Sequence, residues 1–286
     1  MSRIAFLSTD NLEDFFVYDE LLIPVFKQSG HQVDTVSWHN SDTDWSVYSM
    51  VIVRSTWDYQ AQPEAFLRCL ENIDKQAQLQ NPLELMRWNL DKSYLKALAE
   101  AGIATLPTRW VEHYDEPLLI EQFSAFHTDK MVIKPTVSAN ADDTFVITPD
   151  SVKAQSALLS SCFNHRAHMI QPFADEIVNH GEYSLFYFGG ELSHCILKTP
   201  KGGDFRVQEE HGGSLELVNA DAAQQHISEA VLAALPQPAL YARIDIVQFN
   251  NQWCVIEVEL IEPSLYFNLD DQSPRRFVEA VTELLD

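Results

Sequence analysis

Carboxylates interrupt two strongly β-prone runs near the end of the chain. The run ARIDIVQ carries Asp245 between two isoleucines, and WCVIEVELIEP carries Glu257 and Glu259. Side chains two residues apart on a strand share a face, so the two glutamates project together. Like charges on one face destabilise a sheet unless a cation compensates them. The pattern predicts that the three acids hold one or two magnesium ions, because magnesium takes few carboxylates and completes its shell with water and phosphate.

The connection between these two strands decides whether the acids meet. A plain two-residue turn at Asn250 and Asn251 would pair Ile244 with Glu257 and put Asp245 on the opposite face. An odd-length or bulged connection pairs Asp245 with Glu257 instead. The metal hypothesis therefore predicts a three-residue or bulged turn. The alternative is a solvated edge strand whose acids face water.

The charge of the chain limits its partners. Forty-two acidic and 19 basic residues give a formal charge of −23 over 286 residues, which repels nucleic acid and anionic membranes. A nucleotide site would need local lysine, arginine and divalent cations. No signal peptide or long apolar run is evident, so we expect a cytoplasmic protein with no nucleic-acid or membrane partner. A homodimer stays open as an alternative to a monomer.

Alternating apolar runs and helical patterns predict an N-terminal α/β unit over residues 1–88. Its expected elements are strands at 3–8, 32–38 and 50–55, a helix within 17–30, and a helix that starts at Pro63. Ligand sites in such units lie at the carboxyl ends of the strands. Arg54, Thr56, Trp57 and Tyr59 follow the strand at 50–55, and Arg54 could take a substrate carboxylate through two hydrogen bonds. The alternative is that these side chains pack one domain on another.

The rest of the sequence predicts two α+β units, at residues 89–167 and 168–286. In the first we expect a helix at 91–102, strands at 103–110, 131–135 and 145–148, and a helix at 150–161. In the second we expect strands at 168–173, 182–188, 191–199, 241–249 and 253–263, with helices at 221–235 and 274–286. Gly189 and Gly190 supply the positive φ angles of a hairpin turn.

Five side chains in these units are candidates for nucleotide contacts. Lys134 ends an apolar strand, and lysine suits phosphate as a point charge. Ser138 is the best candidate in the following loop of small residues. Gln171 and Phe173 end a strand whose backbone could read a purine edge, and Glu182 suits a ribose hydroxyl. A structural lysine, an ordinary loop and plain strand ends are the alternatives.

A loop with glycines near both ends follows the hairpin. Lys198 and Arg206 flank the sequence KGGDF, and Gly212 and Gly213 mark the other end of the loop. Glycine permits backbone conformations that a closing loop needs. We expect the loop to close over substrate, with a mobile surface loop as the alternative.

In their order these pieces resemble the ATP-grasp superfamily, and within it the prokaryotic glutathione synthetase and RimK-like branch. NPLELMRWNLDKSYL is similar to the entry to the central domain, where Lys92 matches the first phosphate lysine, and MVIKPTVSANADDTFVI is similar to the second lysine and phosphate loop. RSTWDY, KPTVSANADDT and EVELIEPSLY are also similar to a narrower group that includes the cyclo-ligase forming D-cycloserine. The resemblance implies a fold in which an N-terminal α/β domain precedes two α+β subdomains that clasp ATP.

The resemblance also implies an activity. ATP, with Mg²⁺ or alternatively Mn²⁺, would phosphorylate a substrate carboxylate, and an amine would capture the acylphosphate. Lys198 and Arg206 would act at the transferred phosphoryl group, while Arg243 and Ser264 join the candidates for substrate binding, although Arg243 could simply pair with Glu259. The small-molecule partners would be a carboxylate and an amine. An intramolecular cyclo-ligase and a non-catalytic ATP and magnesium binding regulator are the alternatives.

Three departures from the glutathione synthetase pattern stand out. The phosphate loop contains no glycine, Glu259 occupies a position that is commonly asparagine, and Ser184 replaces an arginine. The extra carboxylate should tighten cation binding. The serine argues against identity with glutathione synthetase.

Overall fold

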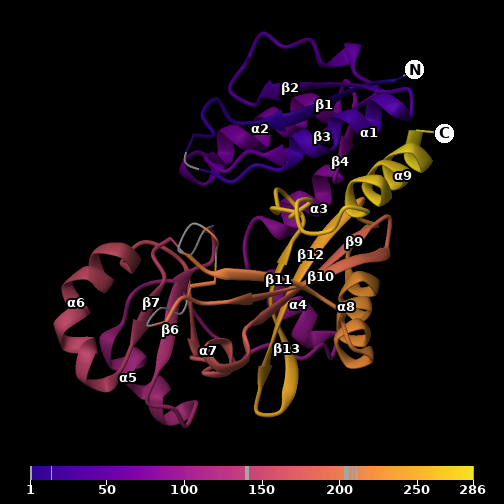
Figure 1. The fold of residues 1–286 in the computed structure, drawn as a ribbon. Coiled ribbons are helices and arrows are strands. Elements are labelled where there is room, and N and C mark those ends of the chain that lie inside the picture. The colour runs from indigo at the N-terminus through magenta and orange to yellow at the C-terminus, as the bar shows by residue number, and fades with distance from the viewer. Residues whose placement is uncertain are drawn as a thin grey trace.

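The computed structural model describes residues 2–13, 15–138, 142–202, 206–207, 209 and 212–285. Its strands form three separate sheets, which follow one another along the chain (Figure 1). The mixed α/β architecture confirms the predicted fold class. The three sheets fall in the order of the three predicted units, whose boundaries stay predictions.

The N-terminal sheet is parallel, with strand order β2-β1-β3-β4. Its strands are β1 (Arg3–Ser8), β2 (Gln32–Ser37), β3 (Met50–Ser55) and β4 (Gln78–Gln80), and its helices are α1 (Ile23–Gln28) and α2 (Pro63–Asp74). The helix expected within 17–30 is shorter than predicted, because Pro24 fits only the first turn of α1. A 3₁₀ turn at Asp19–Leu21 precedes it.

The middle sheet is antiparallel, with order β5-β8-β6-β7. It contains β5 (Arg109–Val111), β6 (Met131–Pro135), β7 (Phe145–Ile147) and β8 (His168–Pro172), with helices α5 (Glu116–Ala125) and α6 (Pro149–Phe163) packed against it. The prediction of a strand at 103–110 is mostly wrong. Thr105 makes one isolated bridge to Val255, and the strand starts at Arg109. Pro107 interrupts the run because proline has no amide to donate to a ladder.

The C-terminal sheet is also antiparallel, with order β11-β10-β9-β12-β13. Its strands are β9 (Glu182–Phe188), β10 (Glu191–Thr199), β11 (Ser214–Val218), β12 (Tyr241–Phe249) and β13 (Gln252–Glu259). The remaining helices are α3 (Leu83–Asn89), α4 (Tyr94–Glu100), α7 (Glu176–His180), α8 (Ala222–Ala234) and α9 (Ser273–Leu285). The predicted hairpin glycines are confirmed, with φ of 58° at Gly189 and 88° at Gly190.

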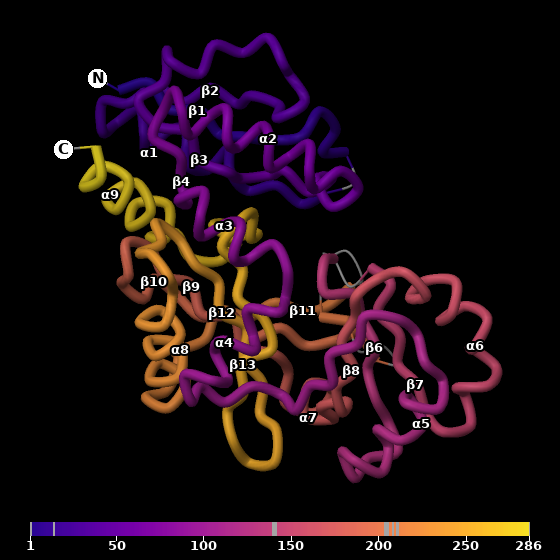
Figure 2. The backbone as a smooth tube through the Cα atoms, turned by 180° about the vertical axis from the view of Figure 1, so that it is seen from behind, coloured from indigo at the N-terminus to yellow at the C-terminus, as the bar shows by residue number. Residues whose placement is uncertain are grey.

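The two faces of the C-terminal sheet meet different partners. Helices α4 and α8 cover one face, where Leu98 and Val231 pack among buried residues of β9, β12 and β13. On the other face α9 and the N-terminal sheet share a core, in which Phe277 and Phe6 belong to one cluster with Phe186. Figure 2 shows α9 running from this sheet to the N-terminal unit. The helices leave part of this second face open beside the middle sheet.

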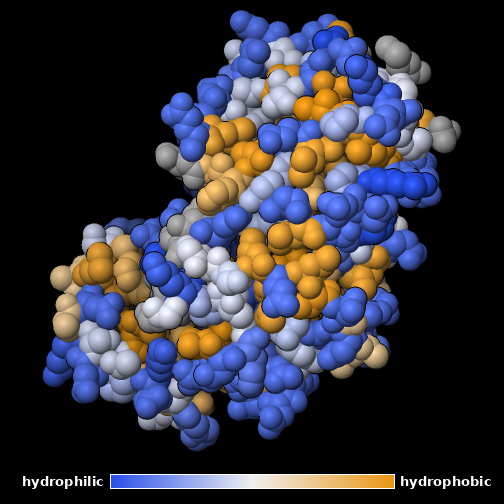
Figure 3. Space-filling model, viewed as in Figure 1, coloured by the Kyte–Doolittle hydropathy of each residue, from blue (hydrophilic) through white to orange (hydrophobic). Residues whose placement is uncertain are grey.

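The surface carries both polar and apolar areas. In Figure 3 apolar residues gather in patches over all three units, and polar residues cover much of the surface between them. None of the helices in the described part of the chain combines the length and the apolar character that crossing a bilayer requires.

Candidate functional site

A cleft opens between the middle and C-terminal sheets, and residues of the N-terminal unit line one part of it. Fifteen of the candidate side chains line it: Trp57, Tyr59, Lys92, Lys134, Ser138, Gln171, Phe173, Glu182, Lys198, Arg206, Arg243, Asp245, Glu257, Glu259 and Ser264. Four other candidates, Arg54, Thr56, Gly212 and Gly213, are not among the lining residues. The structure thus brings together segments that are far apart in the sequence.

A bulge in β13 sets the register of the acidic strands. Asp245 pairs with Glu257, but Ile246 pairs with Val255, so Ile256 is left without a ladder partner. Asp245 and Glu257 therefore share one face, as the metal hypothesis required. The predicted bulge is confirmed, but its position is wrong: the turn itself has two residues, Asn250 and Asn251, with φ of 52° and 62°. The extra residue lies within the ladder instead.

Asparagine and tyrosine side chains fix the end of β13 that carries the glutamates. Asn89 at the end of α3 donates to Val258 O at 2.7 Å and accepts from Leu260 N at 2.9 Å. The Tyr94 hydroxyl accepts a hydrogen bond from Val258 N at 2.9 Å. All these groups are buried, so an unpaired backbone amide would be costly here. This clamp holds Glu257 and Glu259 in place on the sheet.

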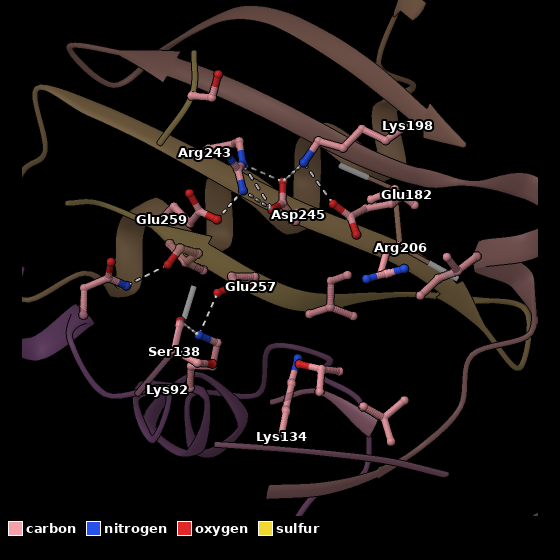
Figure 4. Close-up of a pocket in the computed structure, with 18 of the residues that line it drawn as sticks. Lys92, Lys134, Ser138, Glu182, Lys198, Arg206, Arg243, Asp245, Glu257 and Glu259 are labelled. Atoms are coloured by element: carbon pink, nitrogen blue, oxygen red, sulfur yellow. Dashed lines mark hydrogen bonds and ion pairs between the residues drawn. The ribbon is translucent and has the colours of Figure 1, made fainter. Parts of the chain in front are cut away.

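The acids of the open face pair with basic side chains (Figure 4). Arg243 Nη2 lies 3.0 Å from Asp245 Oδ2, and the same guanidinium also pairs with Glu259. Lys198 Nζ lies 3.5 Å from Asp245 Oδ1 and 3.0 Å from Glu182 Oε1. Arg243 thus makes the pair with Glu259 that was the alternative to a substrate contact, and substrate binding by Arg243 stays a prediction. Ser184, on the neighbouring strand β9, also donates a hydrogen bond to Asp245.

Lys92 and Lys134, from the predicted unit at residues 89–167, face these acids from across the cleft (Figure 4). Lys92 Nζ lies 3.1 Å from Glu257 Oε1 and donates to the Ser138 carbonyl oxygen at 2.6 Å. It therefore links the end of the phosphate-loop candidate to the acidic strand. Burial lowers the pKa of Lys134, Glu257 opposes this shift, and the nearby Lys92 adds to it. A bound anion would relieve the repulsion between the two ammonium groups.

The pKa values of the paired groups follow from burial and neighbouring charge. Burial and Arg243 lower the pKa of Lys198, but Asp245 and Glu182 outweigh them and raise it overall. Burial raises the pKa of Glu259 to about 7, although Arg243 opposes the shift. The site thus holds charges that interact strongly because little water separates them. Among the described residues no three His, Cys, Asp or Glu side chains converge as a metal-binding group; Glu257 and Glu259 pair with Lys92 and Arg243 instead.

Apolar side chains line the cleft near Gln171 and Phe173. Leu106, Val132 and Ile177 lie there with Ile256, the bulged residue of β13. Gln171 donates to the Thr108 hydroxyl at 2.9 Å, and the Phe173 backbone amide donates to Lys130 O at 2.9 Å. Lys130 Nζ also lies 3.5 Å from the centre of the Phe173 ring. This part of the cleft is suited to a flat aromatic group.

The candidates of the N-terminal unit divide into two groups. Trp57 and Tyr59 line the cleft. Arg54 is 2% exposed and makes bonds of 2.9 and 2.8 Å to Asp19, together with one of 3.3 Å to Pro263 O. It lines a second cavity, and its contacts match the packing alternative. Thr56 is fully buried. Substrate binding by Arg54 and Thr56 stays a prediction.

The long loop after β10 is only partly described. Arg206 and Ser264 line the cleft, and Gly212 has φ of 79°. The part of KGGDF at residues 203–205 lies outside the described residues, as do 208, 210 and 211, so closure of the loop stays a prediction.

Several lining residues escaped the sequence analysis. Among them are Phe15, Tyr94, Glu262 and Tyr266. Glu262 follows the acidic strand in the run EVELIEP, and a third acid in that run was the available signal. No sequence pattern pointed to Phe15 or Tyr94, because only the tertiary structure turns them toward the cleft.

Comparisons with known proteins match both halves of the chain. Residues 105–273 match the family described as prokaryotic glutathione synthetase, ATP-grasp domain, and residues 4–81 match the D-cycloserine synthetase DcsG N-terminal domain. The cycloserine biosynthesis protein DcsG of Streptomyces lavendulae is 29% identical over 285 residues, which cover 92% of each chain.

Solved structures give the same result. The crystal structure of D-cycloserine synthetase DcsG is similar with a TM-score of 0.88 at 27% identity, covering 99% of this chain and 100% of that one. A RimK domain ATP-grasp protein from Sphaerobacter thermophilus has a TM-score of 0.73 at 16% identity, with coverage of 97% and 98%. At 16% identity, the similarity to the RimK domain protein concerns the fold alone.

Proposed function

We infer the reaction from one premise: this chain belongs to the ATP-grasp family of the prokaryotic glutathione synthetase type. It is an enzyme, a ligase that uses ATP to join a carboxylate to an amine. We propose that it binds ATP together with magnesium.

The observation that carries the proposal is the charge balance of the cleft. Its basic side chains are Lys92, Lys134, Lys198, Arg206 and Arg243, and its acidic side chains are Glu182, Asp245, Glu257, Glu259 and Glu262. Five positive and five negative groups give a formal charge of zero, although the whole chain carries −23. A locally neutral cleft that contains several basic side chains can accept an anion that the rest of the surface repels.

We assign the cleft to the parts of a nucleotide in order. Lys92, Lys134 and Ser138 lie where phosphates would bind, and the apolar part near Gln171 and Phe173 would hold the adenine. Glu182 would accept hydrogen bonds from the ribose. These assignments are supported by the lining of a single cleft, in which Figure 4 shows Lys92 and Ser138 near Glu257 and Glu182 near Lys198.

Asp245, Glu257 and Glu259 have the donor chemistry that magnesium needs. Carboxylate oxygens are its preferred protein ligands. Each of the three acids now pairs with a lysine or arginine, and nucleotide phosphates would draw those basic groups away. Bound magnesium would neutralise charge on the phosphates. Two ions fit better than one, because the three acids span two neighbouring strands; manganese has the same ligand preference.

The remaining residues act on the substrate carboxylate as it attacks the terminal phosphate. The transfer needs positioning and charge neutralisation more than covalent help from the protein. Lys198 and Arg206 line the cleft and would stabilise the charge on the transferred group. An amine then displaces the phosphate from the acylphosphate to form the C–N bond. A dry cleft would protect that intermediate from water.

The test is a screen of amino acids, dipeptides and ureido-type acids for substrate-dependent release of ADP. Glu257→Gln should abolish turnover while leaving the fold intact, and Glu229→Gln on the exposed side of α8 is the matched control. Full activity of Glu257→Gln would refute the metal assignment. A regulator without catalytic activity would bind ATP, seen as a thermal shift, but would release no ADP with any acid.

Intramolecular ring closure is the second candidate. Two observations favour it: the N-terminal unit matches the D-cycloserine synthetase N-terminal domain, and that enzyme's structure aligns with this chain over its whole length. A cyclo-ligase needs one organic substrate besides ATP, whereas an intermolecular ligase needs two. Release of ADP that saturates with a single acid and yields a cyclic product would favour ring closure. A strict requirement for a separate amine would exclude it.

A further inference from the structure

Glu262 differs from the other acids of the cleft in its surroundings. Each of the other four forms an ion pair with a lysine or arginine. For Glu262, the described part of the chain shows no ion pair. Its partners are neutral: the Tyr59 hydroxyl donates a hydrogen bond to it, and Gln60 Nε2 donates from 3.4 Å. It is only 9% exposed, yet it lines the cleft.

Aromatic side chains surround the same part of the cleft. Phe15, Trp57 and Tyr59 all line it, and the Phe15 and Trp57 rings lie 5.2 Å apart. Trp57 Nε1 donates to the Glu262 carbonyl oxygen at 2.8 Å, which fixes the indole beside that residue. Tyr59 stacks on Phe66 at 4.6 Å between ring centres. A carboxylate among fixed aromatic faces is a favourable environment for an ammonium group.

We propose that Glu262, with Trp57 and Phe15, forms the subsite for a positively charged amino group of the substrate. The substrate class would then be amino acids and their derivatives that keep a free ammonium group. The inference rests on the proposed ligase function, since it concerns the part of the cleft lined by residues of the N-terminal unit, away from the residues assigned to the nucleotide. Ser264 also lines the cleft two residues further along, within reach of the same small ligand.

The electrostatics of Glu262 support this assignment. Burial raises the pKa of its carboxyl to about 8, and Glu259 adds to the shift. The hydrogen bond from Tyr59 and the more distant charges of Lys92 and Arg243 oppose it without cancelling it. A cation in the subsite would supply the missing opposite charge and favour the ionised form. Binding of an ammonium ligand should therefore release a proton from Glu262.

The experiment compares ligands that differ only in the amino group. Both enantiomers of serine are titrated calorimetrically into the ADP and magnesium complex, where no turnover occurs, and both enantiomers of glycerate replace that amino group by a hydroxyl. One enantiomer of serine should bind roughly 10- to 100-fold more tightly than its glycerate counterpart, the range of a charge-assisted hydrogen bond. Glu262→Gln should reduce this preference to below about 3-fold.

Two controls separate recognition from folding. Glu262→Asp keeps the charge on a shorter side chain and should retain part of the preference, and Glu229→Gln should behave as wild type. The affinity for ADP should stay the same in all variants, which shows that each is folded.

Three results would overturn the inference: equal binding or no binding of serine and glycerate by the wild type, a preference that survives in Glu262→Gln, or a magnesium affinity that falls in that variant. The last would place Glu262 among the metal ligands. If the wild type releases ADP with a carboxylic acid but shows no preference for the amino form, the ligase function stands and the subsite is wrong. If the wild type prefers serine but releases no ADP with any acid, the subsite stands and the ligase function is wrong.

Discussion

Replacement of Gly181 by alanine tests how tightly the cleft is built. Gly181 joins α7 to β9, directly before Glu182, and has φ of 83° and ψ of −179°. This region is essentially restricted to glycine and costs other residues about 1–3 kcal/mol. A Cβ atom here would lie 2.6 Å from the Lys198 carbonyl oxygen and 2.6 Å from Leu197 Cδ1. The leucine can rotate, but the carbonyl belongs to β10.

The magnitude follows from these two effects. An ordinary contact starts at 3.4 Å, so the backbone must separate by 3.4 − 2.6 = 0.8 Å. Overpacking of this kind costs about 1–3 kcal/mol. Together with the strain, and less about 0.4–1 kcal/mol from the stiffer unfolded chain, Gly181→Ala should lose roughly 1–5.5 kcal/mol. Movement at Lys198 should also weaken its pair with Glu182, and with it the binding of ADP.

Urea unfolding of the wild type and of two alanine variants measures this. Gly190→Ala is the matched control, because Gly190 has φ of 88° but no atom within 4 Å of the added methyl group. It should lose only about 1–2 kcal/mol, the cost of the left-handed backbone, and keep its affinity for ADP. Equal losses in the two variants would refute the steric reasoning. An unchanged ADP affinity in Gly181→Ala would refute its link to the Glu182–Lys198 pair.

Two further predictions concern the buried charges. Asp245→Asn should lower the free energy of unfolding by about 1–3 kcal/mol without nucleotide. The loss is limited because Lys198 and Arg243 each keep one other acidic partner. A variant that unfolds in urea with wild-type stability would contradict this. The pKa of Glu262 is raised to about 8, so the folded state binds this proton more tightly than the unfolded state does. Protonation of Glu262 therefore adds to the free energy of unfolding, fully at acid pH, and this contribution is lost as the pH rises toward 8. Glu262→Gln cannot titrate and should flatten this pH dependence of unfolding; the same slope in both proteins would contradict the assignment.

Local patterns in the sequence were sufficient for most of the secondary structure. The strands β1 and β3 have the predicted bounds, and the helix predicted from Pro63 begins there. Apolar periodicity, proline position and hairpin glycines report on neighbours within a few residues, so they survive folding unchanged. The same is true of the two acidic strands, whose alternation placed Glu257 and Glu259 on one face.

The partners of those residues were decided by the tertiary structure. A bulge at Ile256, rather than the turn, brought Asp245 opposite Glu257. Lys92 reaches Glu257 across 165 positions of sequence (257 − 92). Such pairings depend on the order of the strands and on one extra residue in a ladder, which no local pattern encodes.

The sequence by itself therefore determined most of the charged groups that line the cleft, and their order along the chain. It could not determine which of them neutralise each other. Arg54 pairs with Asp19, whereas Glu262, which the sequence did not single out, has Gln60 as a neutral partner. Charge pairing depends on distances of a few ångströms in a medium of low dielectric, and these distances exist only after the three sheets have packed.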